Sequence, residues 1–290
     1  MATAPSPQVE GPALNMTAGL GFKLQHFVEA LTARADGLWF EVHAENYMVD
    51  GGPRLAVLMA LRERHAVSLH GVGLSIVSAD PPSPDYLRRL KTLAERVSPV
   101  MMSDHLAWQK WDGTHIADFL PFPRTREALG LAADNLSRVQ DLLGRPLLVE
   151  NPSLYIDVSG HEMPETDFLI ELAGRSGCGL LVDINNVFVS ASNLGFSAEA
   201  YVDALPAALI GEIHLAGHSR DGDLDSSLLI DSHGAPVSDP VWLLYQRLVG
   251  RIGARPTLSE RDADIPAFAD LMVERAHAHA LIRATESGNV

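Results

Sequence analysis

Histidine and carboxylate residues recur at one place in this sequence, at the end of short apolar runs. Six runs end in this way, and their terminal residues are His70, His105, Glu150, Asp183, His214 and Glu260. Two further candidates, Asp231 and His233, stand in the segment that follows His214. Imidazole nitrogens and carboxylate oxygens are the ligands that divalent transition metals bind in proteins. The pattern therefore indicates a metal centre.

The charge of these residues and their number both favour several metal ions. Burying an unpaired carboxylate costs roughly several kcal/mol, and only one cationic residue, Arg261, is adjacent to a run end. Asn186, three residues after Asp183 in DINN, adds an amide oxygen that can bind a metal or support a ligand. Four imidazoles, four carboxylates and this amide are too many ligands for one ion, but they suit two or three.

Each of these residues also has a structural interpretation when it is taken alone. A single histidine at a strand end is more often a hydrogen-bonded core residue than a ligand, and a single buried acid has either role about equally often. Independent structural roles explain poorly why such residues end six separate runs and recur in one loop. We therefore favour the metal centre.

Other polar residues near the run ends are candidates for contact with a substrate or with the ligands. Glu41, His43 and Asn46 lie in FEVHAENY, where Glu41 is expected to point into the core and Asn46 to line a pocket. A structural role in the loop remains an equal alternative for these three. Asn151, directly after Glu150, is expected to hydrogen-bond a ligand. His218, in AGHSRDGD, is expected on an exposed loop, and contact with a substrate is the less favoured alternative.

Short apolar runs alternate with longer amphipathic stretches along the chain, which predicts the elements that position these residues. The expected strands span 19–22, 38–43, 66–71, 99–105, 146–151, 179–185, 209–215 and 256–261. The expected helices span 24–34, 53–64, 84–97, 124–143, 165–176, 197–206, 239–252 and 265–283. Such alternation is typical of an α/β fold, the (β/α)₈ TIM barrel, whose strands present their carboxyl ends on one rim. A doubly wound open sheet is the alternative, but no G-x-G-x-x-G follows the first strand.

Composition limits the domain organisation and the redox chemistry. The chain has 290 residues, of which 47% are hydrophobic, and this suffices for one large core. Residues 1–15 are predicted to form a flexible tail and residues 16–290 a single barrel domain. The only cysteine, Cys178, stands in the apolar run CGLLV and is expected to be buried. A disulfide within the chain and a cysteine-rich metal site are therefore excluded.

Charge and hydropathy bear on partners and location. The net charge of −15 argues against nucleic-acid binding, which needs a Lys- and Arg-rich face. No run of about 18 apolar residues is present, so no membrane span is expected. The N-terminus lacks a basic segment followed by an apolar one, as a Sec signal would require. We therefore expect a cytoplasmic protein.

Eight segments of the chain resemble, in order, the MbnB-like multinuclear non-haem iron-dependent oxidative enzymes, a family formerly catalogued as a domain of unknown function. The segments are FEVHAENY, SLHGVGLS, SDHLAW, LLVENPS, LVDINNVFVSA, IHLAGH, LIDSHGAPV and SERD. The resemblance covers about residues 16–285. It implies a TIM-like, xylose isomerase-like barrel with two or three iron ions. The matching ligand positions are His70, His105, Glu150, Asp183, Asn186, His214, Asp231, His233 and Glu260.

The resemblance also implies an activity. Such enzymes use O₂ to modify residues, often cysteines, in ribosomally made precursor peptides, which a partner protein usually delivers. Iron with open coordination positions suits this role because it accepts both O₂ and a soft thiolate ligand.

A second hypothesis is a hydrolase or isomerase that uses zinc, magnesium or manganese, as in endonuclease IV and xylose isomerase-like barrels, whose ligand order is similar. Asn186 stands where those endonucleases carry a histidine, which weakens the third metal position. A third hypothesis is a non-enzymatic subunit that binds a partner. The ligand-rich strand ends argue against it, because a binding subunit needs no group of metals.

Overall fold

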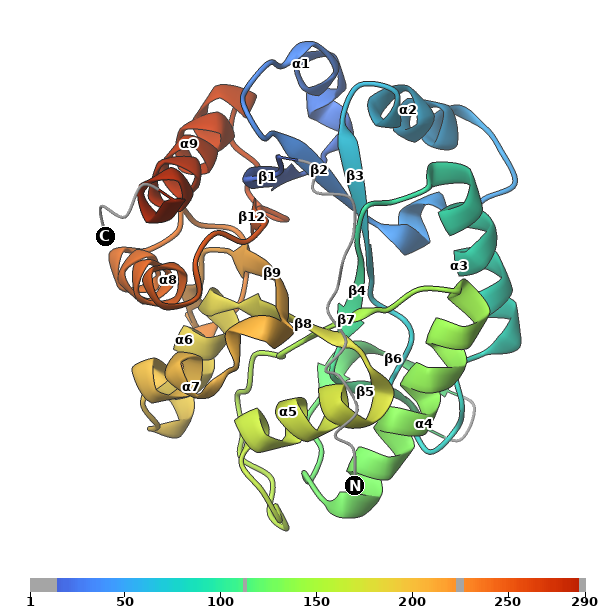
Figure 1. Ribbon diagram of the computed structural model, residues 1–290, viewed down its shortest axis with the longest axis vertical. Helices are drawn as coiled ribbons and strands as arrows, with labels where there is room; N and C mark the ends of the chain where they lie inside the picture. The colour runs from blue at the N-terminus through green and yellow to red at the C-terminus, as the bar shows by residue number, and fades with distance from the viewer. Residues whose placement is uncertain (1–14, 112–113, 223–226, 287–290) are drawn as a thin grey trace.

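The strands of the barrel form a closed ring of eight parallel neighbours (Figure 1). The computed structural model describes residues 15–111, 114–222 and 227–286, so the predicted tail, residues 1–15, lies outside it apart from Asn15. Around the ring the strands are β1 (Ala18–Gly21), β2 (Trp39–His43), β3 (Ala66–Gly71), β4 (Met102–His105), β7 (Leu148–Glu150), β8 (Gly179–Asp183), β9 (Ile210–Leu215) and β12 (Thr257–Ser259). β12 closes the ring by pairing with β1. The predicted (β/α)₈ TIM barrel is confirmed.

Helices surround the barrel on its outside (Figure 1). They are α1 (Phe27–Thr32), α2 (Pro53–Arg62), α3 (Pro84–Val97), α4 (Arg126–Leu143), α5 (Glu165–Ser176), α6 (Ile184–Leu194), α7 (Ala198–Ala204), α8 (Asp239–Ile252) and α9 (Phe268–Glu286). Short 3-10 turns, η1 (Leu24–His26), η2 (Ala44–Tyr47) and η3 (Ala207–Leu209), join some of them to strands. Helix α3 shows how the sequence specifies this layer. Pro84 occupies its first turn, and Leu90, Leu93 and Val97 form the buried stripe toward the strands.

Several predicted boundaries are wrong, and one error bears on the metal centre. The strand expected over 179–185 ends at Asp183, and α6, which the sequence did not predict, begins at the next residue. The Asp183 side chain caps this helix, since its Oδ1 accepts a hydrogen bond from the Asn186 backbone at 2.7 Å. Strand and helix join without a loop, which places Asp183 and Asn186 together at the barrel rim.

Other differences are local. The strand expected over 99–105 begins at Met102, and the helix expected over 24–34 begins as η1. The helix expected over 197–206 is the shorter α7. Two antiparallel hairpins, which the sequence did not predict, lie in the loops after β4 and β9. Their strands are β5 (Trp108–Trp111) with β6 (Thr114–Leu120), and β10 (Ser219–Arg220) with β11 (Leu229–Ile230).

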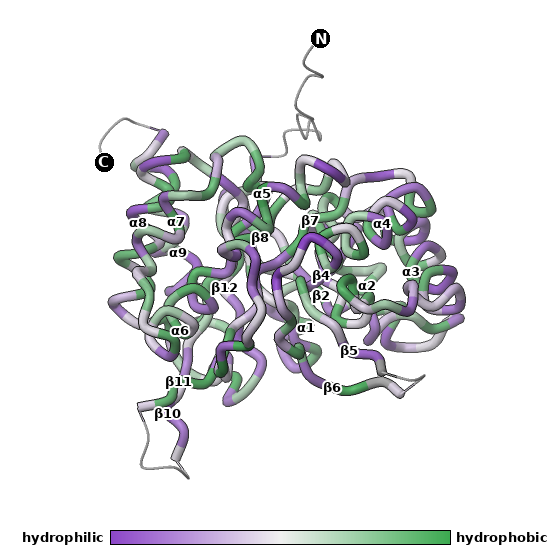
Figure 2. Tube along the Cα trace, turned by 90° about the horizontal axis from the view of Figure 1, so that it is seen from below, coloured by the Kyte–Doolittle hydropathy of each residue, from purple (hydrophilic) through white to green (hydrophobic). Residues whose placement is uncertain are grey.

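The two hairpins mark the carboxyl rim of the barrel. Both project from the same side, the lower one in Figure 2, because each follows the carboxyl end of a barrel strand.

Cys178 lies just before β8 and is buried, as predicted, and burial raises the pKa of its thiol to about 11. No helix in the described part of the chain has the length and apolar character needed to span a membrane.

Candidate metal centre

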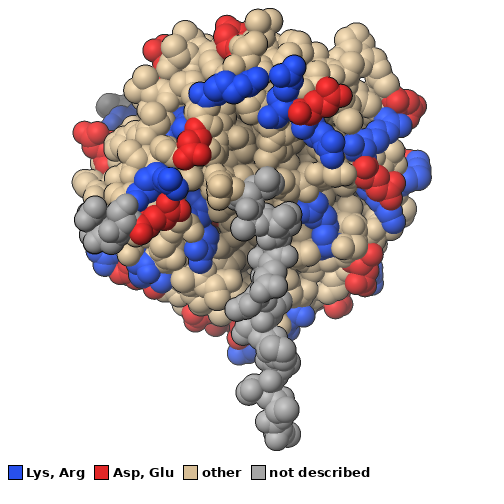
Figure 3. Space-filling view, turned by 45° about the horizontal axis from the view of Figure 1, so that its top comes forward, with Lys and Arg blue, Asp and Glu red and all other residues tan. Residues whose placement is uncertain are grey.

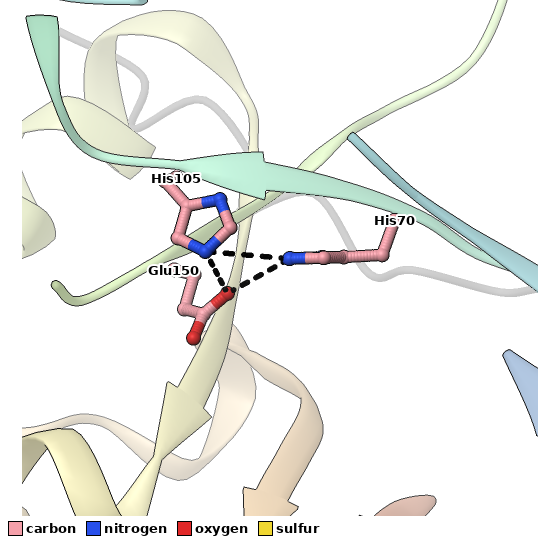
Figure 4. Close-up of side chains that lie close together, drawn as sticks. All are labelled: His70, His105 and Glu150. Carbon is pink, nitrogen blue, oxygen red and sulfur yellow. Dashed lines mark hydrogen bonds and ion pairs between the residues drawn. The ribbon is translucent and has the colours of Figure 1, made fainter. Parts of the chain in front are cut away.

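Three neighbouring strands, β3, β4 and β7, bring His70, His105 and Glu150 to a common point (Figure 4). His70 Nε2 lies 3.4 Å from His105 Nε2 and 3.3 Å from Glu150 Oε2. His105 Nε2 lies 3.4 Å from the same carboxylate oxygen. Ligand atoms around one ion have about this spacing when each metal–ligand bond is about 2.0–2.2 Å long. The three buried side chains can therefore hold one ion.

Neighbouring groups orient both imidazole rings toward that point. His70 Nδ1 lies 2.8 Å from Ser103 Oγ, and His105 Nδ1 lies 3.3 Å from the Gly71 carbonyl oxygen. Both contacts hold Nδ1 and leave Nε2 directed at Glu150. Phe119, on the β5–β6 hairpin, stacks on His105 with ring centroids 3.7 Å apart, which shields one face of the ring from water.

A second group of possible ligands shares Glu150 with the first. One ligand atom each from Glu150, Asp183 and His214 lies within 4.8 Å of the others, and all three residues are buried. Glu150 Oε2 and Asp183 Oδ2 have no hydrogen-bond partner among the described residues. Buried carboxylate oxygens are rarely left unsatisfied, so both atoms are candidates for binding cations.

A third group, Asp183, His233 and Glu260, extends the arrangement toward the loop after β11. His233 Nδ1 lies 3.6 Å from Glu260 Oε2, and its Nε2 lies 2.9 Å from Asp231 Oδ1. The His233 backbone adopts a left-handed conformation with φ of 49°, which is uncommon outside glycine. Its amide donates to the Gly217 carbonyl at 3.0 Å, and this contact helps to hold the strained turn.

The two predicted asparagines lie between these groups. Asn186 Nδ2 donates to Glu150 Oε1 at 3.2 Å and to the Asn151 carbonyl at 3.1 Å, while its Oδ1 has no partner among the described residues. The Asn151 side chain pairs with the Asp183 backbone, accepting from its N–H at 2.9 Å and donating to its carbonyl at 3.1 Å. Asn186 can therefore support Glu150 through Nδ2 and also offer Oδ1 to a metal ion, while Asn151 supports Asp183.

The residues of FEVHAENY lie at the end of β2, where His43 is next to His70 of the neighbouring strand β3. His43 Nε2 lies 3.3 Å from Glu260 Oε1. A cavity of about 250 Å³ opens beside this pair, and Glu41, Asn46 and Arg54 contribute to its wall. Glu41 is buried inside the barrel, and the exposed Asn46 lines the cavity, so both residues lie where we expected them.

Sequence reasoning missed several residues of this region. Glu212 is fully buried beneath His214, and Asp262 lies 3.1 Å from His233 Nδ1. His218, which we expected on an exposed loop, is half-buried, and its Nδ1 lies 2.8 Å from Asn185 Oδ1. Asn185 in turn donates to Asp231 Oδ1 at 2.7 Å. The sequence did contain a signal for Asn185, because this residue stands in DINN, two residues after the predicted ligand Asp183.

Burial and neighbouring charges shift the pKa values of several of these residues. It raises the pKa of Asp183 to about 7, with repulsion from Asp231 adding to the effect. Burial likewise raises the pKa of Glu150 well above its usual value, and it lowers the pKa of His105 to about 3. For His214, burial opposes the charged form, but Glu41 and hydrogen bonds to neighbouring carboxylates outweigh it and raise the pKa. Without cations, Asp183 and Glu150 therefore hold protons at higher pH than exposed carboxylates do, and metal ions would displace these protons.

Stability measurements against pH test this electrostatic description. Asp183 has a pKa of about 7 in the native state and 3.8 as its ordinary value, so the native state holds an extra proton between these pH values. The metal-free protein should therefore lose free energy of unfolding, relative to an Asp183→Asn variant, as pH rises from 3.8 to about 7. The difference should then level off. Chemical unfolding of both proteins in a chelator measures it, and parallel curves would contradict the shift.

Comparisons with known proteins agree with this fold and identify a family. The chain matches, over residues 17–283, the family described as RiPP precursor modification enzyme MbnB/TglH/ChrH. A protein of Caulobacter sp. (strain K31) named UPF0276 protein is 62% identical over 269 residues, which cover 93% of this chain and 97% of that protein.

Solved structures share the barrel at low sequence identity. A xylose isomerase domain protein from Planctomyces limnophilus has a TM-score of 0.55 at 13% identity, covering 96% of this chain and 99% of the other. Endonuclease IV from Thermus thermophilus has a TM-score of 0.57 at 15% identity, covering 94% of this chain and 99% of the other. These similarities concern the fold alone. Because the family match spans nearly the whole described chain, the protein belongs to the MbnB/TglH/ChrH family of RiPP precursor modification enzymes.

Proposed function

We propose that this protein uses two or three iron ions and O₂ to oxidise cysteine residues in a ribosomally made precursor peptide. Family membership supports the peptide substrate. The proposal of several metal ions rests on one observation, that adjacent groups of possible ligands share residues. Glu150 belongs to the first and second groups, and Asp183 to the second and third. A carboxylate common to two groups can bridge two ions, so these groups suit a polynuclear centre better than separate single sites.

The donor set suits iron. Imidazole and carboxylate ligands without thiolate are typical of non-haem iron centres that keep open positions. Iron held there would supply redox chemistry with O₂. The buried oxygens that lack hydrogen-bond partners, Glu150 Oε2 and Asp183 Oδ2, are the atoms that such ions would satisfy.

The protein's own residues would admit the substrate and exclude water. The cavity of about 250 Å³ reaches His43 and Glu260 at the metal centre, and its volume fits one or two peptide residues. Lys23 and Arg54 stand along the same wall, where they can contact the peptide backbone. The stacked ring of Phe119 covers His105 on the other side.

A cavity of this size leaves most of a precursor peptide unbound, so we propose that a partner protein holds the remainder and delivers it. We do not expect nucleic acid as a substrate. On the face drawn in Figure 3, Lys and Arg side chains alternate with Asp and Glu side chains, and the net charge of the chain is −15. Such a surface is unsuited to a phosphate backbone.

Metal analysis of protein purified without oxygen from iron-replete cells tests the proposal. We expect two or three iron ions per chain, with one ion in each occupied group of ligands. We also expect the protein to consume O₂ only when a cysteine-containing peptide is added. Elemental analysis and an oxygen electrode measure the two quantities. Stoichiometric zinc with an activity that iron cannot restore would instead favour a hydrolase or isomerase.

A further inference from the structure

The two ring nitrogens of His214 face different surroundings. Nδ1 lies 3.3 Å from Glu260 Oε2, on the side of the metal centre. Nε2 points into the barrel, 3.3 Å from Glu41 Oε1 and 3.6 Å from Glu212 Oε1. The exposed fractions of His214 and Glu212 are 0%, and that of Glu41 is 2%. Water therefore has no access to the inner nitrogen.

The chemistry of imidazole limits what these nitrogens can do. A neutral histidine ligand binds a metal through one nitrogen and carries a proton on the other. If Nδ1 binds the ion beside Glu260, then Nε2 carries the proton, and a buried N–H needs an acceptor. Glu41 and Glu212 are the carboxylates that the described structure places within about 4 Å of Nε2.

We propose that Glu41 and Glu212 are positioning residues that hold His214 with its proton on Nε2, so that Nδ1 binds the metal. The present distances slightly exceed the usual N–H···O range of about 2.7–3.2 Å, and a small rotation of either carboxylate would complete the bond. An acceptor with negative charge also makes the imidazole a stronger ligand. The inference rests on the proposed metal centre, but it does not depend on iron or on the peptide.

The strand pattern explains why both carboxylates reach this place. Glu212 precedes His214 by two residues on β9, so the two side chains lie on the same face of the strand, toward the barrel axis. Glu41 enters from β2, which is separated from β9 in the ring by β12 and β1. Two independent strands thus supply acceptors to one nitrogen. Mutation of either strand position should therefore affect the same histidine.

Zinc binding provides a test, because zinc takes the same ligands and is diamagnetic. Four variants are compared with the wild type: Glu212→Ala, Glu212→Gln, Glu41→Ala and Glu41→Gln. Competition with a chelator measures zinc affinity, and NMR of ¹⁵N-histidine-labelled, zinc-loaded protein shows which nitrogen of His214 carries the proton. Glu165→Ala is the matched control, since Glu165 is a mostly buried glutamate that accepts from Tyr201 at 2.7 Å, away from the metal ligands.

We expect the wild type to show a slowly exchanging proton on His214 Nε2. Each Ala variant should bind one zinc ion about 10–100-fold more weakly and exchange that proton faster. The Gln variants should stay within a few-fold of the wild type, because a glutamine carbonyl oxygen accepts the same N–H. The Glu165→Ala control should retain its zinc affinity, and thermal unfolding confirms that every variant is folded.

Three outcomes would contradict either the positioning role or the metal centre on which it rests, and they can be distinguished from one another. A proton on Nδ1, or Ala variants with wild-type affinity, would refute the positioning role while leaving the metal centre intact. Loss of one tightly bound ion from both Ala variants, with Nε2 unprotonated in the wild type, would show a buried cation on Glu41 and Glu212 instead. A folded wild type that binds no zinc, iron or other transition metal would refute the metal centre itself.

Discussion

Replacing Glu150 with Ala should release more than one metal ion and leave no measurable turnover. Glu150 is common to two groups of possible ligands, one with His70 and His105 and one with Asp183 and His214. Removing its carboxylate takes a charged ligand from both groups at once, and it also removes the acceptor that holds the Asn186 amide. Elemental analysis of the purified variant and mass spectrometry of the peptide product measure the two effects.

Two further variants separate the loss of a bridging ligand from general damage to the barrel. Glu150→Gln keeps the shape and size of the side chain but not its charge, and it should also lose metal. Glu165→Ala removes a mostly buried glutamate that contacts Tyr201 and Arg124 outside the metal centre, and it should keep both metal and turnover. If Glu150→Ala retained its full metal content and rate, the proposed centre would be misplaced.

The barrel was predictable because its strands are short, apolar and separated by amphipathic helices. Runs such as LWFEVH and GLLVDIN are buried on both faces, which gives a strong signal. The start of α6 was missed because no loop separates it from β8. Asp183 ends the strand and caps the helix, and a residue with both roles leaves no turn signal between them. The hairpins β5–β6 and β10–β11 were missed because they lie outside the repeating pattern of strand and helix.

The candidate site was predictable where a residue ends a strand. His70, His105 and Glu150 meet because parallel neighbouring strands carry their carboxyl ends to one rim, a rule that follows from the fold class alone. Glu212 was missed because it stands two residues before a strand end, where a barrel normally places apolar residues. The period of two along a strand was the available signal, since it puts Glu212 on the same face as His214.

Loop residues show where sequence reasoning ends. Asp231 and His233 were identified from their types and spacing alone, but their partners depend on how the chain returns to the rim. Asp262 contacts His233, and Lys23 pairs with Asp262, although these residues stand on three separate loops. No periodicity links such loops, so only the folded structure brings these three residues together.

A precursor peptide with serine in place of cysteine should bind but remain unmodified. The proposed reaction depends on a soft sulfur ligand, for which an iron ion with an open position has a preference that a serine hydroxyl does not meet. Contacts elsewhere on the peptide, including those to the partner protein, are unchanged, so the serine peptide should compete with the natural one. We expect mass spectrometry after aerobic incubation to show an oxidative mass change in the cysteine peptide only.

The same experiment without oxygen tests the role of O₂, the proposed oxidant. Under anaerobic conditions the cysteine peptide should bind and keep its mass, and later admission of air should start the reaction. The peptide to use is a cysteine-containing precursor, supplied together with the proposed partner protein. Equal modification of the serine peptide, or modification without O₂, would refute oxidation at cysteine. It would also favour a divalent-metal hydrolase, because hydrolysis at a metal centre requires neither a thiol nor an oxidant.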